Sequence, residues 1–92
     1  MNSSDPNDGD NRLLGLERVP EIFVEGYRGA MTRAGMIKLN FFTNRLDPVT
    51  GAIEKHAAMT LAMPTRDFAE VATALNALLQ DLQARGVIGK ED

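Results

Sequence analysis

The sequence contains no cysteine, no tryptophan and only one histidine. Without cysteine the chain can form neither a disulfide framework nor a thiolate metal site, and the lone His56 excludes a site with two histidines. No apolar run approaches the roughly 20 residues of a membrane-spanning helix, and the N-terminus lacks the pattern of a secretory signal. We therefore expect a cytoplasmic protein that does not meet a membrane and holds no metal or other cofactor.

The middle of the chain carries no net charge. The net charge of −3 comes from the acidic ends, because seven basic side chains between residues 19 and 86 face seven acidic ones. Such a chain lacks the basic footprint of a nucleic-acid-binding protein. The length of 92 residues suffices for one small domain. We expect a disordered acidic tail and lead-in over residues 1–18, one domain over residues 19–88 and a short tail over residues 89–92.

Three stretches have the composition of β-strands. Residues 21–28 alternate β-branched and aromatic side chains with polar ones, and Gly26 indicates a bulge or a close backbone approach. Residues 29–35 are turn material. Residues 36–44 form the clearest strand, and residues 52–63 form a third that places Ala57 and Met59 on one face. The lead-in leucines Leu13, Leu14 and Leu16 are expected to pack against the domain, with a docking segment for a partner as the alternative.

The connection between the second and third strands carries turn signals in the right places. Asp47 can accept hydrogen bonds from the turn backbone, Pro48 presets φ, and Gly51 supplies the left-handed conformation.

A helix over residues 65–85 follows the third strand. Pro64 ends that strand, Thr65 is the expected N-cap, and Gly86 suits a Schellman ending. Apolar residues recur at spacings of three and four along one side of this helix, and we call this set the helix stripe: Phe68, Val71, Ala72, Leu75, Leu78, Leu79 and Leu82.

The element order predicts an α+β fold, a three-stranded antiparallel meander with one long C-terminal helix packed on one face. One helix gives this sheet thin cover, and its outer strands have open edges. We expect a homo-oligomer, a dimer as first choice, with Phe23, Tyr27 and Phe42 on the second sheet face as the candidate interface.

Catalytic patterns are weak throughout the chain. Glu54 and His56 share a strand face and could form a base with its orienting carboxylate, but an exposed hydrogen-bonded pair is the simpler interpretation. Arg28 and Arg33 flank the glycine-containing turn and could hold an anion, although solvated arginines are the commoner case. We predict no catalytic, cofactor-binding or metal-binding residues and no enzymatic activity.

The chain resembles a family of short bacterial proteins known only as a domain of unknown function. The similarity covers roughly residues 20–83, and its stretches are EIFVEGYRG, GMIKLNFFTN and AAMTLAMPTRDFAEVATALNALLQDL. It implies the strand–strand–strand–helix architecture and neither an activity nor site residues. By element order alone, the chain is also similar to antiparallel-sheet export chaperones.

These observations predict a non-enzymatic, homo-oligomeric interaction module, an adaptor or accessory subunit. The alternatives are a small-ligand or anion-binding domain that uses Arg28 and Arg33 and, more remotely, chaperone-like binding of clients by an exposed sheet face. The sequence identifies neither the partner nor the process.

Overall fold

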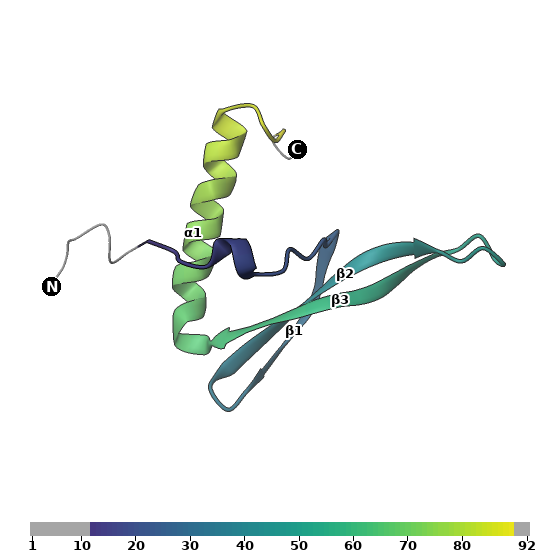
Figure 1. Ribbon diagram of the computed structural model, residues 1–92, viewed down its shortest axis with the longest axis horizontal. Helices are drawn as coiled ribbons and strands as arrows, with labels where there is room; N and C mark the ends of the chain where they lie inside the picture. Colours follow the sequence, from purple (N-terminus) through teal and green to yellow (C-terminus); the bar gives the residue numbers. More distant parts are fainter. Residues whose placement is uncertain (1–11, 90–92) are drawn as a thin grey trace, which may run out of the picture.

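A three-stranded antiparallel sheet is followed by one helix, as the sequence predicts (Figure 1). The structure, a computed structural model, describes residues 12–89, so most of the predicted acidic tail and residues 90–92 lie outside it. The sheet has the order β1-β2-β3, and a short 3-10 helix, Leu16–Arg18, precedes it. The regular elements are β1 (Gly26–Arg33), β2 (Met36–Leu46), β3 (Ile53–Pro64) and α1 (Thr65–Ala84).

The first strand lies five residues later than the sequence predicts. Residues 29–33, which we expected to be turn, belong to β1, and the turn itself consists of Ala34 and Gly35. Both have positive φ, 53° and 78°, as a two-residue hairpin turn that follows the twist of its strands requires. The alternating stretch before Gly26 belongs to no strand, and its one backbone hydrogen bond to β2 is made by Glu25.

Two bulges change which side chains share a face. The register with β2 places one extra residue in β1 between Tyr27 and Ala30, next to Gly29 at φ 93°, and one extra residue in β3 at Ala58. Because each extra residue reverses the alternation, Ala57 pairs with Phe42 and leaves the face of Met59 on which we had placed it.

Gly26 makes the close backbone approach that its position in the sequence indicates. It pairs with Phe42, and a Cβ built on Gly26 would stand 2.5 Å from the Phe42 ring. The φ of Gly26 is not positive, so the space taken by the ring, and not backbone conformation, requires glycine here.

The β2–β3 hairpin extends past the end of β1 (Figure 1). Glu25, the residue just before the start of β1, forms hydrogen bonds with β2. Its N–H donates to the carbonyl of Phe42 (2.8 Å), and its Oε1 accepts from the N–H of Asn44 (2.7 Å). One carboxylate thus satisfies a backbone donor that a further strand residue would otherwise pair.

The helix begins and ends within one residue of the prediction, but its N-terminus differs. Pro64 is the N-cap residue, and Thr65 is already helical. The N–H and Oγ1 of Thr65 both donate to the carbonyl of Gly35, at 2.8 and 3.2 Å. At the other end, Gly86 has φ 78°, and the N–H of Val87 donates to the carbonyl of Leu82. This is the predicted Schellman ending.

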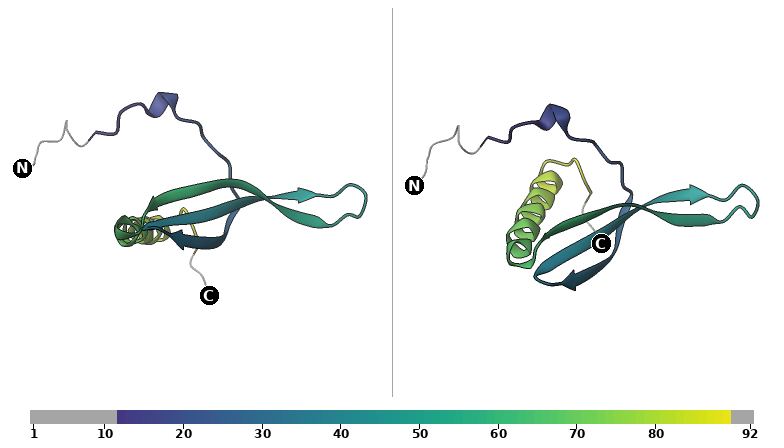
Figure 2. Two further views of the ribbon diagram at one scale, coloured as in Figure 1. Left: turned by 90° about the horizontal axis from the view of Figure 1, so that it is seen from below. Right: turned by 60° about the horizontal axis from the view of Figure 1, so that its bottom comes forward.

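The core of the described chain is very small. Ile37, at 9% exposure, is the only buried apolar residue in residues 12–89. The helix stands away from the sheet beyond its first turns, and the segment before β1 arcs clear of both (Figure 2). Leu13, Leu14 and Leu16 are therefore exposed and do not pack against the domain as we expected. The radius of gyration is 17.6 Å, against about 12 Å for a compact chain of this length.

Gly26→Ala should destabilise the protein by about 1–3 kcal/mol, because the new methyl group displaces the Phe42 ring. Urea unfolding of Gly26→Ala, Phe42→Leu and the double variant measures the effect. The double variant should lose less than the sum of the single losses, since leucine leaves room for the methyl group. Strictly additive losses would mean that the two groups do not collide.

Candidate functional site

An apolar groove runs between the sheet and the first turns of α1. It encloses about 410 Å³, and its lining comes from all three strands and the helix: Tyr27, Leu39, Phe41, Leu61, Met63, Phe68, Val71, Ala72 and Leu75. Only the Tyr27 hydroxyl interrupts this apolar surface. A groove with this lining can hold apolar side chains and has no group suited to bond making or breaking.

Cross-strand pairing builds the floor of the groove. Leu39 lies opposite Leu61 on β3, and Phe41 lies opposite Tyr27 on β1. The rings of Tyr27 and Phe41 meet edge to face, with centroids 6.0 Å apart and planes at 64°. The same groove also contains helix residues, so Leu39, Phe41, Leu61 and Met63 lie on the helix side of the sheet.

The helix stripe forms the wall of the groove and then continues beyond it. Phe68 and Val71 are half-buried, whereas Leu75, Leu78 and Leu79 are 59%, 49% and 41% exposed. The helix thus lies on the predicted face, but only its first turns cover the sheet. Its second half presents leucines to solvent.

The three aromatic residues of the predicted interface do not share a face. Tyr27 lies on the helix side because its ring packs against Phe41, whereas Phe42, the next residue, points to the other side. Phe23 precedes β1 and is 73% exposed. Phe42 is half-buried against Gly26, so less of its ring is available than we expected. The bulge after Tyr27 causes this error, and its only signal in the sequence is Gly29.

The second face of the sheet carries a smaller open pocket that two basic side chains border. It measures about 270 Å³ and is lined by Arg28, Asn40, Phe41, Phe42, Lys55 and Ala57. The Lys55 ammonium lies 5.2 Å from the centre of the Phe42 ring, a cation–π contact. Within residues 12–89, no carboxylate forms an ion pair with Arg28 or Lys55.

Arg28 and Arg33, the predicted anion site, are not brought together. Both belong to β1, where five residues separate them by about 16 Å, and only Arg33 adjoins the turn. Lys55 takes the place that we had given to Arg33. The sequence did not predict that Lys55 and Arg28 border one pocket, because the bulge at Ala58 determines the face of the sheet on which Lys55 lies.

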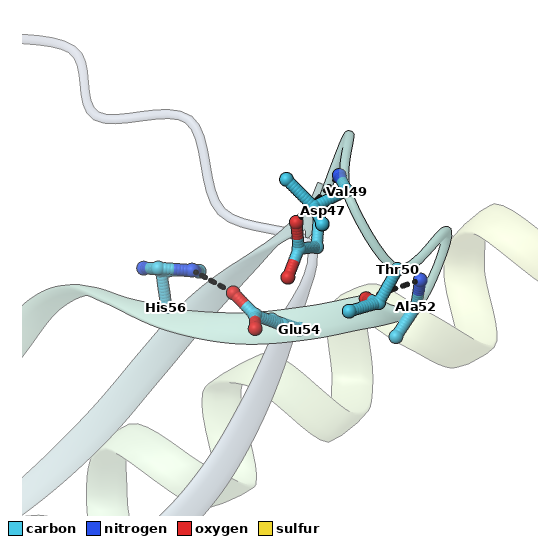
Figure 3. A network of polar contacts seen from close by, with 6 residues as sticks. All are labelled: Asp47, Val49, Thr50, Ala52, Glu54 and His56. Carbon is cyan, nitrogen blue, oxygen red and sulfur yellow. Dashed lines mark hydrogen bonds and ion pairs between the residues drawn. The ribbon is translucent and has the colours of Figure 1, made fainter.

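The tip of the β2–β3 hairpin holds a network of polar contacts (Figure 3). Asp47 Oδ1 accepts from the N–H of Val49 (2.8 Å), and the Asp47 carbonyl accepts from Gly51, whose φ is 75°. The loop therefore folds as its sequence predicts. The bond from Val49 holds the pKa of the Asp47 carboxyl below its usual value.

Glu54 and His56 share a face as predicted, with Oε1 and Nε2 3.1 Å apart. Both side chains are about half exposed, and neither lines a pocket described above. In the described part of the chain, no group of three or more acidic or histidine side chains is placed to hold a metal ion. Nor is any helix there both long and apolar enough to cross a membrane.

Comparison with known proteins gives no match: no family model, no curated protein and no solved structure matches the chain. The resemblance to the bacterial family of unknown function therefore stays a prediction.

Asp47 should make the stability of the fold depend on pH under acidic conditions. Since folding lowers the pKa of Asp47, its carboxylate stabilises the fold above its ordinary pKa, and the stabilisation is lost as the pH falls through the lowered value. Asp47→Asn can still accept the Val49 bond but does not titrate. The difference in urea midpoint between wild type and Asp47→Asn should therefore shrink from about pH 7 to about pH 3, on either side of the usual aspartate pKa. An unchanged difference would contradict the assignment.

Proposed function

We propose that the protein is a non-enzymatic interaction module of the cytoplasm that works as a homo-oligomer, with a dimer as the basic unit. The observation that carries this proposal is the apolar surface that one subunit leaves uncovered, on the groove and on the second half of the helix stripe. A monomer gains nothing by exposing such a surface, whereas association buries it.

The polar surfaces favour binding over catalysis. Glu54 and His56, the acid–base pair that the sequence predicts, lie on an open strand face outside both cavities. A general base must be positioned against a held substrate, and this pair lines neither cavity. The groove, by contrast, has volume and shape but no reactive group.

Anion binding is a second candidate, now centred on Arg28 and Lys55. Two cations without carboxylate partners in the described residues border one pocket, and Phe42 and Asn40 complete its wall. An anion with a flat apolar part suits this combination, because the Phe42 ring offers a surface for stacking and the cations offer charge.

The oligomeric state tests the leading proposal. Analytical ultracentrifugation over a range of protein concentrations should give a dimer or a multiple of dimers, with loss of folded protein on dilution. A folded, monodisperse monomer at tens of micromolar would refute it.

Leu75→Ala measures how far association covers the stripe. Leu75 is 59% exposed in one subunit, so truncation of an isolated subunit should cost little. If a partner covers Leu75, the same change should lower the free energy of unfolding in urea by about 2–5 kcal/mol. Val49→Ala, at a loop side chain that is 89% exposed, is the control and should change the stability little. A Leu75→Ala loss no larger than that of the control would mean that the stripe stays in solvent.

A thermal-shift screen with phosphate-bearing and aromatic carboxylate compounds tests the second candidate. A ligand of the pocket should raise the melting temperature by mass action. Lys55→Met should abolish that shift, whereas Arg33→Met, at the far end of β1, should preserve it. Equal loss in both variants would show that binding does not use the pocket.

A further inference from the structure

We propose that the groove of each subunit is filled by the second half of helix α1 from a second copy of the chain. This inference rests on the proposed function and adds which surfaces meet. In the pair, each sheet face lies under the first turns of its own helix and the last turns of the partner's helix.

The groove needs an occupant whenever the chain is folded, because its floor is the core side of the sheet. Ile37 is the only buried apolar residue in the described chain, and Leu61 at the centre of the floor is 39% exposed. A domain this small with so little burial does not hold its fold alone. A permanent partner must be synthesised in the same amount as this chain. A second copy of the chain always meets that condition.

The helix carries more apolar surface than its own groove can use. Phe68, Val71 and Leu75 line the groove, while Leu78 and Leu79 continue the stripe outside it. From Val71 to Gln80 the helix has no charged residue. Leu75, Leu78 and Leu79 lie in this uncharged stretch, so they can enter an apolar groove without the cost of desolvating an ion. Asp81, the next residue, is paired with Arg85.

One two-fold rotation between the subunits brings the helix of each into the groove of the other. If the second half of each helix enters the other subunit's groove, the helices run antiparallel, and Leu75, midway along the stripe, lies nearest the axis. Groove and helix are then complementary parts of the same surface, as an isologous dimer requires.

The total exposed surface of the chain leaves room for such an interface. The chain exposes 7679 Å², whereas a folded monomer of its mass is expected to expose about 5,200 Å². A standard interface removes about 800 Å² from each partner. The difference exceeds that requirement.

Cross-linking between two different single-cysteine variants tests the exchange. The natural chain has no cysteine, so each variant has one reactive site. Leu61→Cys in the groove floor and Leu79→Cys in the second half of the helix are mixed, refolded together and treated with a short bismaleimide. One variant carries a tag, so the mixed dimer has its own position on a denaturing gel. We expect a covalent mixed dimer.

The matched control replaces Leu79→Cys with Ala77→Cys, which lies on the opposite side of the same helix, and the mixed dimer should be lost. A third mixture uses Leu14→Cys in the exposed segment before β1. A mixed dimer with Leu14→Cys but not with Leu79→Cys would overturn the inference, because that segment would then fill the groove. Sedimentation of each mixture separates the two proposals. Dimers without the Leu61–Leu79 product overturn the helix exchange alone, and monomers overturn the proposed function as well.

Discussion

Both hydrogen-bond donors of Thr65 converge on the carbonyl of Gly35, which joins the first residue of the helix to the turn of the first hairpin. This contact fixes the helix start at the end of the sheet, beside the Ala34–Gly35 turn. A helix of 20 residues that starts there and points away from the strands can cover the sheet only with its first turns. The groove, the exposed half of the stripe and the small core all follow from that starting point.

Local signals in the sequence predicted the elements that depend on neighbouring residues. The loop at Asp47, the strand end at Pro64 and the Schellman ending at Gly86 each follow from short-range chemistry, and each has the expected form. The helix stripe was also evident, because its period is a property of the helix alone.

The errors arise where one residue changes the phase of a strand or where tertiary geometry decides. The bulges next to Gly29 and at Ala58 reverse the alternation, which moved Tyr27 to the helix side and placed Lys55 beside Arg28. Nothing in the sequence around Ala58 indicates a bulge. The start of α1 is likewise anchored by a contact between residues 30 positions apart. The sequence predicted the stripe but not how little of it one sheet would cover.

The side chain of Glu25 limits how the sheet itself can grow. An open β2 edge beyond β1 is a template on which any extended chain could add hydrogen bonds, and repeated addition leads to fibres. Glu25 already binds the Asn44 N–H there, so another strand would have to break that bond or bury the carboxylate beside it. Growth along this stretch of the β2 edge is thereby discouraged, while the apolar face stays open. The same carboxylate that completes the hydrogen bonding of β2 beyond β1 thus also protects that stretch of its edge.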